Sequence, residues 1–215
     1  TGKKGEPSAW PAAMSHDYRT KVNDLIARVQ PTAPDKLAVD GWHQFGRNDW
    51  RALAFIPPDG WPPMPGHGHQ DLGSFELHDQ HSEVIVDPGR GSYSNAVYTH
   101  AEVHSSVTVD DIAPVHLNHP NYVDAFRRRV IKKVPEFEHT TTGFTLRSHG
   151  FSPVRGVGKF ERQWSFRNRE VEISDTVEGI GIHKIGRRYV TSTAVKIDKS
   201  SALLSAAGRQ WRLTT

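Results

Sequence analysis

From Leu37 onward the sequence follows one pattern, in which short runs rich in β-branched and aromatic residues are separated by glycine, proline, asparagine and aspartate. Runs of this length and spacing are typical of antiparallel β-sandwiches. We therefore expect an all-β fold, an antiparallel β-sandwich, with strands at residues 50–56, 74–78, 83–87, 103–109, 142–148, 159–167, 170–176 and 189–197.

The clearest expected hairpin turns near Asn168. Before the turn, Phe160, Trp164 and Phe166 fall at even spacing, so they share one face of a strand. After it, apolar and polar residues alternate from Glu170 to Ser174. This period of two predicts a pair of strands with one buried face.

The N-terminal part has a different pattern. Residues 1–14 contain glycine, proline and lysine without periodicity, which indicates a tail. Ser15 is a good N-cap, and apolar residues then recur at helical spacing until Pro31, which predicts one short amphipathic helix. We therefore divide the chain into a tail and helix, residues 1–36, and a β-sandwich domain, residues 37–215. Because the chain opens with Thr1, we expect a processed chain or a piece of a longer protein.

Composition excludes several classes of protein. The 215 residues include no cysteine, so thiolate metal sites, disulfides and cysteine nucleophiles are ruled out. No apolar run approaches the roughly 20 residues of a membrane-spanning helix. The sequence has no zinc-finger spacing and no RNA-recognition motif, so nucleic acid is not an expected partner. The formal net charge of +3 is compatible with an acidic partner.

Groups that can perform chemistry are concentrated between Gly66 and Gly89. Imidazole nitrogen and carboxylate oxygen are ligands that suit Zn²⁺. A single histidine is more often a surface or hydrogen-bonded residue, but the density of this cluster favours a site formed by some of its members. The cluster contains His67, His69, Asp71, His78, His81 and Asp87, and His104 follows.

Three motifs within residues 39–188 resemble, in order and spacing, the C-terminal β-sandwich domain of the heparinase II/III family of polysaccharide lyases. They are GHGHQDLGSFEL, VDPGRGSY and AEVHSSVTVDD. The later RQWSFRNREVEISDTVEGIGIHKIGRR is similar to the family's aromatic strand, aspartate and Gly-x-Gly-x-His pattern. Two departures are Ser105 and Ser106, where the family has asparagine and threonine.

The resemblance implies a function and a site. It implies cleavage of a uronic-acid-containing acidic polysaccharide by β-elimination, in the periplasm or outside the cell. It implies that His67 is the catalytic histidine and that His69, Asp87 and His104 bind zinc. The family's helical toroid domain, which supplies the catalytic tyrosine, does not fit into residues 1–36, so we expect it to be missing from this chain.

The ligand assignment makes a geometric demand. In a hairpin turning near Gln80, Asp87 would lie opposite Ser74, and His69 would be roughly 17 Å away along an extended chain at about 3.3 Å per residue. Residues 66–73 must therefore curl back, which glycine at 66, 68 and 73 permits.

Other residues have less specific roles. Arg90 is expected to bind a substrate carboxylate, because a guanidinium offers bidentate geometry, with a turn-stabilising surface role equally open. Asp71 is expected to act as a turn acceptor in the curled segment. Trp42, Trp50 and Trp61 are candidates for stacking on sugars, and packing is favoured for Trp50.

Two alternative functions stay open at this stage. One is a noncatalytic carbohydrate-binding or structural sandwich, in which the histidines hold only a stabilising metal. The other is a cupin-like metal oxygenase, which ranks last because Gly73 and Ser74 stand where that fold places a glutamate.

Overall fold

The computed structural model describes residues 37–56, 69–80, 82–89, 91, 95–114 and 133–214, together with Thr20, Lys21, Asp24 and Arg28. The chain divides into two compact units, Thr1–Lys36 and Leu37–Thr215. In the first unit the four described residues are helical, and the rest of the predicted helix lies outside the described residues. In the described part of the chain, no helix is long and apolar enough to cross a membrane.

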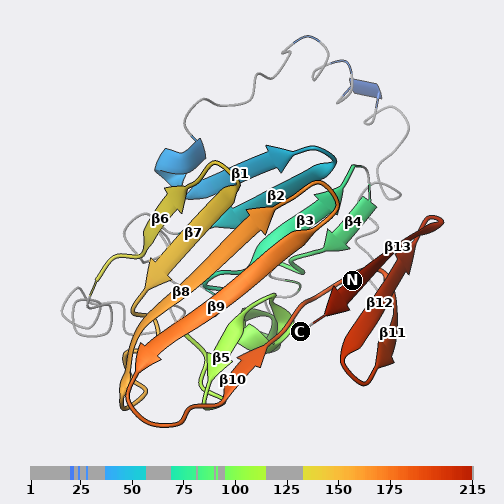
Figure 1. The fold of residues 1–215 in the computed structure, drawn as a ribbon. Coiled ribbons are helices and arrows are strands. Elements are labelled where there is room, and N and C mark those ends of the chain that lie inside the picture. The colour runs from blue at the N-terminus through green and yellow to red at the C-terminus, as the bar shows by residue number, and fades with distance from the viewer. Residues whose placement is uncertain are drawn as a thin grey trace. The chain divides into compact units, whose positions relative to one another are not determined.

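In its described residues, the second unit contains antiparallel strands in four sheets (Figure 1). The first sheet has the order β1-β2-β3-β4. Its strands are β1 (Trp42–Arg47), β2 (Trp50–Phe55), β3 (Phe75–Asp79) and β4 (Ser82–Ile85), and the short 3₁₀ helix η1 (Leu37–Asp40) precedes them. In β2 the even-numbered residues are buried, which matches the period-two pattern of a half-buried strand.

The second sheet has the order β6-β7-β8-β9 and contains the two longest strands. Its strands are β6 (Glu136–His139), β7 (Gly143–Ser148), β8 (Val157–Phe166) and β9 (Val171–Gly179). The predicted hairpin is confirmed, because β8 pairs with β9 and Trp164 lies opposite Ile173. Phe160, Trp164 and Phe166 are all buried.

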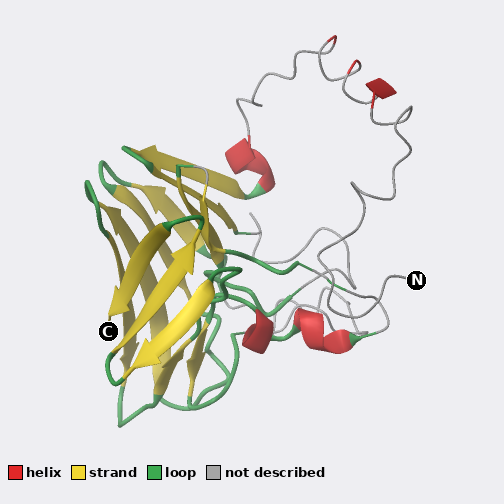
Figure 2. Ribbon diagram, turned by 90° about the vertical axis from the view of Figure 1, so that its right-hand side faces the viewer, coloured by secondary structure: helices red, strands yellow, loops and turns green. Residues whose placement is uncertain are grey.

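Two smaller sheets complete the unit. One pairs β5 (Val107–Val109) with β10 (Ile185–Arg187). The other has the order β11-β12-β13 and appears in red in Figure 1. Its strands are β11 (Ala194–Asp198), β12 (Ser201–Ala206) and β13 (Arg209–Thr214). The 3₁₀ helices η2 (Ala96–Thr99) and η3 (Ala101–Val103) lie beside the strands, not between them (Figure 2).

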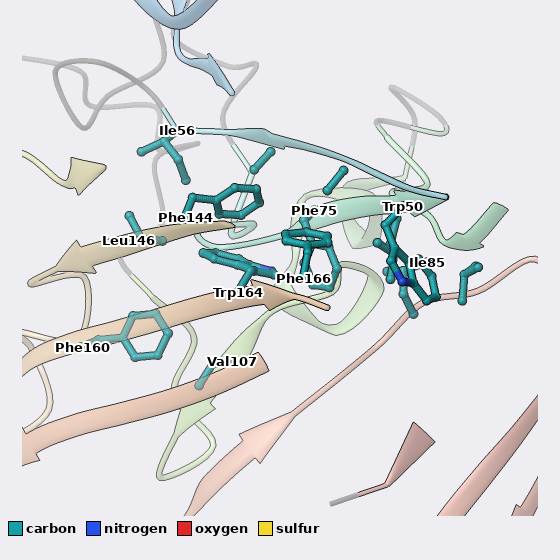
Figure 3. Close-up of a cluster of buried hydrophobic side chains, with 14 of the residues drawn as sticks. Trp50, Ile56, Phe75, Ile85, Val107, Phe144, Leu146, Phe160, Trp164 and Phe166 are labelled. Carbon is teal, nitrogen blue, oxygen red and sulfur yellow. The ribbon is translucent and has the colours of Figure 1, made fainter. Parts of the chain in front are cut away.

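The core lies between the first two sheets, which defines the β-sandwich. The ring of Phe45 in β1 lies 4.6 Å from that of Phe166 in β8, and Phe75 in β3 meets the edge of Trp164 in β8 at 5.7 Å. Figure 3 shows the buried rings of Phe75, Phe144, Trp164 and Phe166 gathered between strands of both sheets. The predicted all-β antiparallel sandwich is therefore confirmed.

Some strand boundaries differ from the prediction. Residues 103–106 belong to η3 and a turn, so only Val107–Val109 of the expected strand forms. Residues 189–193 are not a strand, because their polar groups form isolated contacts with β4 and the residue after it: the N–H of Val86 donates to the carbonyl of Val190, and the hydroxyl of Thr191 donates to the carbonyl of Val84. Strands β1, β6, β10, β12 and β13 were not predicted, and none of them has an alternating face of fully buried residues.

Replacing Phe144 with alanine tests the core. Its side chain is fully buried and its ring lies 4.6 Å from that of Trp164. We expect the Phe144→Ala change to lower the free energy of unfolding by about 3–5 kcal/mol, because it removes buried apolar surface and leaves a cavity. Urea denaturation measures this loss. Val195→Ala, on the exposed strand β11, is the control and should cost under about 0.5 kcal/mol.

Candidate metal centre

Residues 69–74 form a tight turn immediately before β3. The N–H of Ser74 donates to the carbonyl of Asp71 at 2.7 Å, which closes the turn. Gly73 adopts a φ of +78°, and a Cβ at this position would also lie 3.3 Å from a methyl carbon of Leu146. Any other residue would be strained here. The predicted curl is therefore present in residues 69–74, while the other two glycines expected to permit it lie outside the described residues.

Asp87 lies just after β4 and accepts hydrogen bonds from three directions. Its Oδ1 accepts the N–H of Gly89 at 2.8 Å, and its Oδ2 accepts the hydroxyl of Ser74 at 2.9 Å. The same Oδ2 lies 2.9 Å from Nδ1 of His104. Burial alone would raise the pKa of Asp87, but its hydrogen bond to His104 and the charge of that imidazole, with the two other donors, bring the pKa below its ordinary value. The carboxylate is thus held ionised.

His104 is fully buried between η3 and β5. While Nδ1 faces the carboxylate of Asp87, Nε2 lies 3.1 Å from the carbonyl oxygen of Tyr98. Both partners are hydrogen-bond acceptors, whereas a neutral imidazole has one N–H only. One of the two contacts therefore needs a second proton or a cation. Burial lowers the pKa of His104, but the hydrogen bond and charge of Asp87 outweigh it, so the net pKa is raised.

His69 and Asp71 complete a group that can hold a metal ion. The ring of His69 lies 5.1 Å from that of His104, and its Nδ1 lies 3.8 Å from Oδ2 of Asp71. One ligand atom from each of these three residues lies within 4.8 Å of the others. Burial raises the pKa of Asp71 to about 6, with the negative charge of Asp87 adding to the shift and His104 opposing it. In this group two imidazoles and a carboxylate converge, a donor set typical of zinc.

The tetrahedral geometry of zinc gives a scale for these separations. With ligands about 2.0–2.1 Å from the ion, ligand atoms lie roughly 3.3 Å apart. The 2.9 Å between Asp87 and His104 is close to this value, and 4.8 Å within the other group would have to shorten. Both carboxylates, Asp71 and Asp87, are therefore candidate ligands beside the two histidines.

A pocket of about 300 Å³ opens onto this cluster. Its polar wall includes His69, Asp71, Ser74 and Asp87. His104 does not line the pocket, since its side chain is fully buried behind the others. The accessible groups of the centre are therefore His69 and the two carboxylates.

Arg162 holds the two sides of the centre together. Its side chain is fully buried in β8 and forms two hydrogen bonds to Asp175 of β9, at 2.7 and 3.1 Å. Its Nη1 donates to the carbonyl of Gly73 at 2.8 Å and to that of Ser105 at 3.0 Å. Gly73 ends the turn that carries His69, and Ser105 follows His104. Asp175 also accepts a hydrogen bond from Nε of Arg187 at 2.7 Å, which connects the Arg162–Asp175 pair to β10.

The two serines after His104 have defined partners. The N–H of Ser105 donates to the hydroxyl of Ser74 at 3.2 Å, and the hydroxyl of Ser105 accepts the N–H of Val190 at 3.0 Å. The hydroxyl of Ser106 donates to the carbonyl of Leu72 at 3.4 Å. Serine at both positions therefore supports the loops around the centre, although asparagine and threonine were the expected residues.

The structure places three of the five predicted site residues. Asp87 and His104 are in contact, and the ring of His69 is beside that of His104. Their role as metal ligands stays a prediction. His67 and Arg90 lie outside the described residues, so their assigned roles also stay predictions.

Sequence reasoning missed two features of the centre. Asp71 was expected to serve only the turn, and its carbonyl does so, but its side chain also lies in the cluster. Arg162 had a visible signal, because it occupies the inward face of a strand between Phe160 and Trp164, where a charge requires a buried partner. The partner was not identified because the strand register that places Asp175 opposite was unknown.

Comparison with known proteins agrees with this architecture. A family model described as heparinase II/III-like, C-terminal, matches residues 29–215, so the chain belongs to this family, which connects it with polysaccharide lyases. Among solved structures, one titled "Crystal Structure of Heparinase III" superposes with a TM-score of 0.55 at 12% identity. The match covers 77% of this chain and 26% of that one, so this chain spans about a quarter of its length and the likeness concerns the fold. None of the curated proteins matches the sequence.

Removal of the Arg162 guanidinium should weaken both the fold and the centre. In Arg162→Met the buried Asp175 loses its main partner, so the free energy of unfolding should fall by about 3–5 kcal/mol. Zinc affinity, measured by competition with a chromophoric chelator, should fall by about 10–100-fold, because the two ligand-bearing loops lose their shared donor. The control is Arg147→Met, which breaks a partly exposed ion pair on the outer face of the same sheet. It should change the free energy of unfolding and the zinc affinity only slightly. A folded Arg162→Met protein with unchanged zinc affinity would contradict this role.

Zinc affinity should rise with pH between 5 and 8. A ligand must lose its proton to bind a metal, and here the pKa of His104 is raised and that of Asp71 is about 6. Both groups hold protons at pH 5 and release them as the pH rises through these values, whereas Asp87, with its lowered pKa, is already ionised throughout. Calorimetry in buffers of different ionisation enthalpy measures the protons released. In Asp71→Asn fewer protons should be released per zinc near pH 6, because the proton of Asp71 is no longer among them, and a pH-independent affinity in the parent chain would contradict the assignment.

Proposed function

We propose that this chain is the β-sandwich domain of a polysaccharide lyase that cleaves a uronic-acid-containing acidic polysaccharide by β-elimination. Membership of the heparinase II/III-like family supports this reading at the level of the class. The observation that carries it further is the contact of His104 with two acceptors, the carboxylate of Asp87 and the carbonyl of Tyr98. This arrangement suits an imidazole that binds a cation. A hydrogen bond from one ring nitrogen, here Nε2 to Tyr98, orients the other nitrogen toward the metal.

In this proposal His69, Asp87 and His104 hold zinc, and Asp71 is an additional carboxylate beside them. When bound, zinc supplies a fixed positive charge, which disfavours protonation of nearby imidazoles near neutral pH. Three of the residues approach from separate loops, so the ion would also fix the relative positions of those loops. The group of His69, Asp71 and His104 fits this metal by ligand type and by proximity, and Asp87 lies 2.9 Å from His104.

The elimination itself needs three events at the substrate. The uronate carboxylate is neutralised, the C5–H bond breaks and gives its proton to a base, and the C4–O bond breaks as a C4–C5 double bond forms. The leaving oxygen takes a proton from an acid. We assign His67, as a neutral imidazole, to one of the two proton transfers and Arg90 to the carboxylate, for which its planar guanidinium is suited. A tyrosine from outside this chain, in a helical domain, would serve as the other proton-transfer group.

The assay of the full-length protein tests this function. Incubation with uronate polymers should produce a conjugated C4–C5 double bond, seen as new ultraviolet absorbance. His67→Ala should reduce this rate by about 10²- to 10⁴-fold, because it removes a positioned proton-transfer group. His139→Ala, at an exposed position in β6, is the matched control and should keep the parent rate.

The alternative is a noncatalytic sandwich in which the metal only stabilises the loops. It predicts that the full-length protein releases no unsaturated product from any uronate polymer, while His69→Ala still lowers zinc content and thermal stability. The same two measurements therefore separate an enzyme from a binding or structural domain.

A further inference from the structure

The pocket beside the metal centre has a second wall that takes no part in metal binding. This wall is the outer face of the β1–β4 sheet, formed by Trp42, Leu53, Phe55 and Glu76. Antiparallel pairing places Trp42 opposite Phe55 and Leu53 opposite Glu76, so these side chains project from the same face. The pocket thus joins an aromatic surface to the carboxylates of the centre.

Trp42 is exposed but firmly held. It begins β1, and the N–H of Ile56 donates to the carbonyl of Gly41 at 2.8 Å, which extends the ladder past the strand end. Its ring lies 4.8 Å from that of Phe55 at an angle of 44°, and 41% of the residue remains accessible. A large apolar ring kept on a rigid strand at the edge of a polar pocket is the arrangement of a preformed binding surface.

The charges of the pocket narrow the choice of ligand. Three carboxylates line it, those of Asp71, Glu76 and Asp87, and none of its described lining residues is a lysine or an arginine. Zinc bound at the centre would offset Asp71 and Asp87, but Glu76 lies on the aromatic wall outside the centre, so a ligand carboxylate beside Trp42 would meet its negative charge, which disfavours binding. Hydroxyl groups, by contrast, donate well to carboxylates. The flat ring and its acidic neighbours therefore match an uncharged, hydroxyl-rich ring.

We propose that Trp42 forms a sugar subsite that takes an uncharged pyranose, stacked on the indole, with its hydroxyl groups donating to Glu76. This rests on the proposed function, since the ring is then part of the polymer whose uronate is cleaved nearby. The polymer therefore contains an uncharged sugar next to its uronate. A volume of about 300 Å³ is at the lower end of ligand pockets, which suits one or two sugar rings more than a long segment.

Binding measurements on the 215-residue chain test the subsite without any activity. The probes are a neutral chitooligosaccharide, an all-acidic oligogalacturonate and an alternating hyaluronan oligosaccharide, followed by isothermal calorimetry. We expect the chitooligosaccharide and the hyaluronan fragment to bind. Trp42→Ala should weaken the affinity for each by about tenfold, because an aromatic contact of this kind contributes about a tenfold change in affinity. Trp42→Phe should keep part of the affinity. Ile197→Ala, a more exposed apolar position on β11, should change nothing.

Glu76 provides a separate test of charge selection. Glu76→Gln removes one of the three negative charges, so oligogalacturonate should bind more tightly than to the parent chain while the chitooligosaccharide loses affinity. Circular dichroism and thermal melting of each variant establish that the fold is retained.

The outcomes separate this inference from the proposed function. If the parent chain binds no neutral oligosaccharide, or if folded Trp42→Ala binds all probes as the parent does, the subsite is wrong even when the full-length protein is a lyase. If Trp42→Ala instead alters only the association of this domain with the rest of the full-length protein, the exposed ring is an interdomain contact and the subsite is again wrong. If Trp42-dependent binding is found but no unsaturated product ever forms, the subsite stands and the lyase assignment fails.

Discussion

The buried pair of Arg162 and Asp175 is the interaction on which both the fold and the candidate site depend. A buried charge is tolerated only when it is paired and its remaining donors are satisfied. Here Asp175 neutralises the guanidinium, and the carbonyls of Gly73 and Ser105 take its remaining bonds. The pair therefore connects the long hairpin β8–β9 to the two loops that present His69 and His104. One side chain in the core thus donates to both of the loops that carry the two imidazoles.

At the centre, one buried histidine faces two hydrogen-bond acceptors. His104 meets an acceptor at each ring nitrogen, and Asp87 is held ionised by Ser74, Gly89 and the imidazole. A second carboxylate, Asp71, has its pKa raised to about 6, chiefly by burial and further by the negative charge of Asp87. Two carboxylates beside two imidazoles in one cluster concentrate negative charge where a divalent cation can be bound. The aromatic surface of Trp42 then lies at the other side of the same pocket, so metal binding and ligand stacking are adjacent.

Much of this could be predicted from the sequence, and the limits are physical. Strong alternation predicted β2 and the hairpin at Asn168 well, because one face of each strand is buried. The proximity of Asp87 to Ser74 followed from hairpin register, and Gly73 marked the turn that brings back His69. Residues 189–193 looked like a strand by composition, but their polar groups form isolated contacts with β4 and the residue after it, which only the tertiary arrangement determines. The role of Arg162 depends on contacts 57 and 89 residues away in the chain, which no local pattern reveals.

The most direct test of the account is anomalous X-ray scattering at the zinc edge from crystals of this chain grown with zinc. The account predicts a single strong peak within bonding distance of His69, His104 and at least one carboxylate of Asp87 or Asp71. Absence of a peak between these side chains, or a peak only at unrelated surface histidines, would contradict it and leave the β-sandwich without its proposed metal centre.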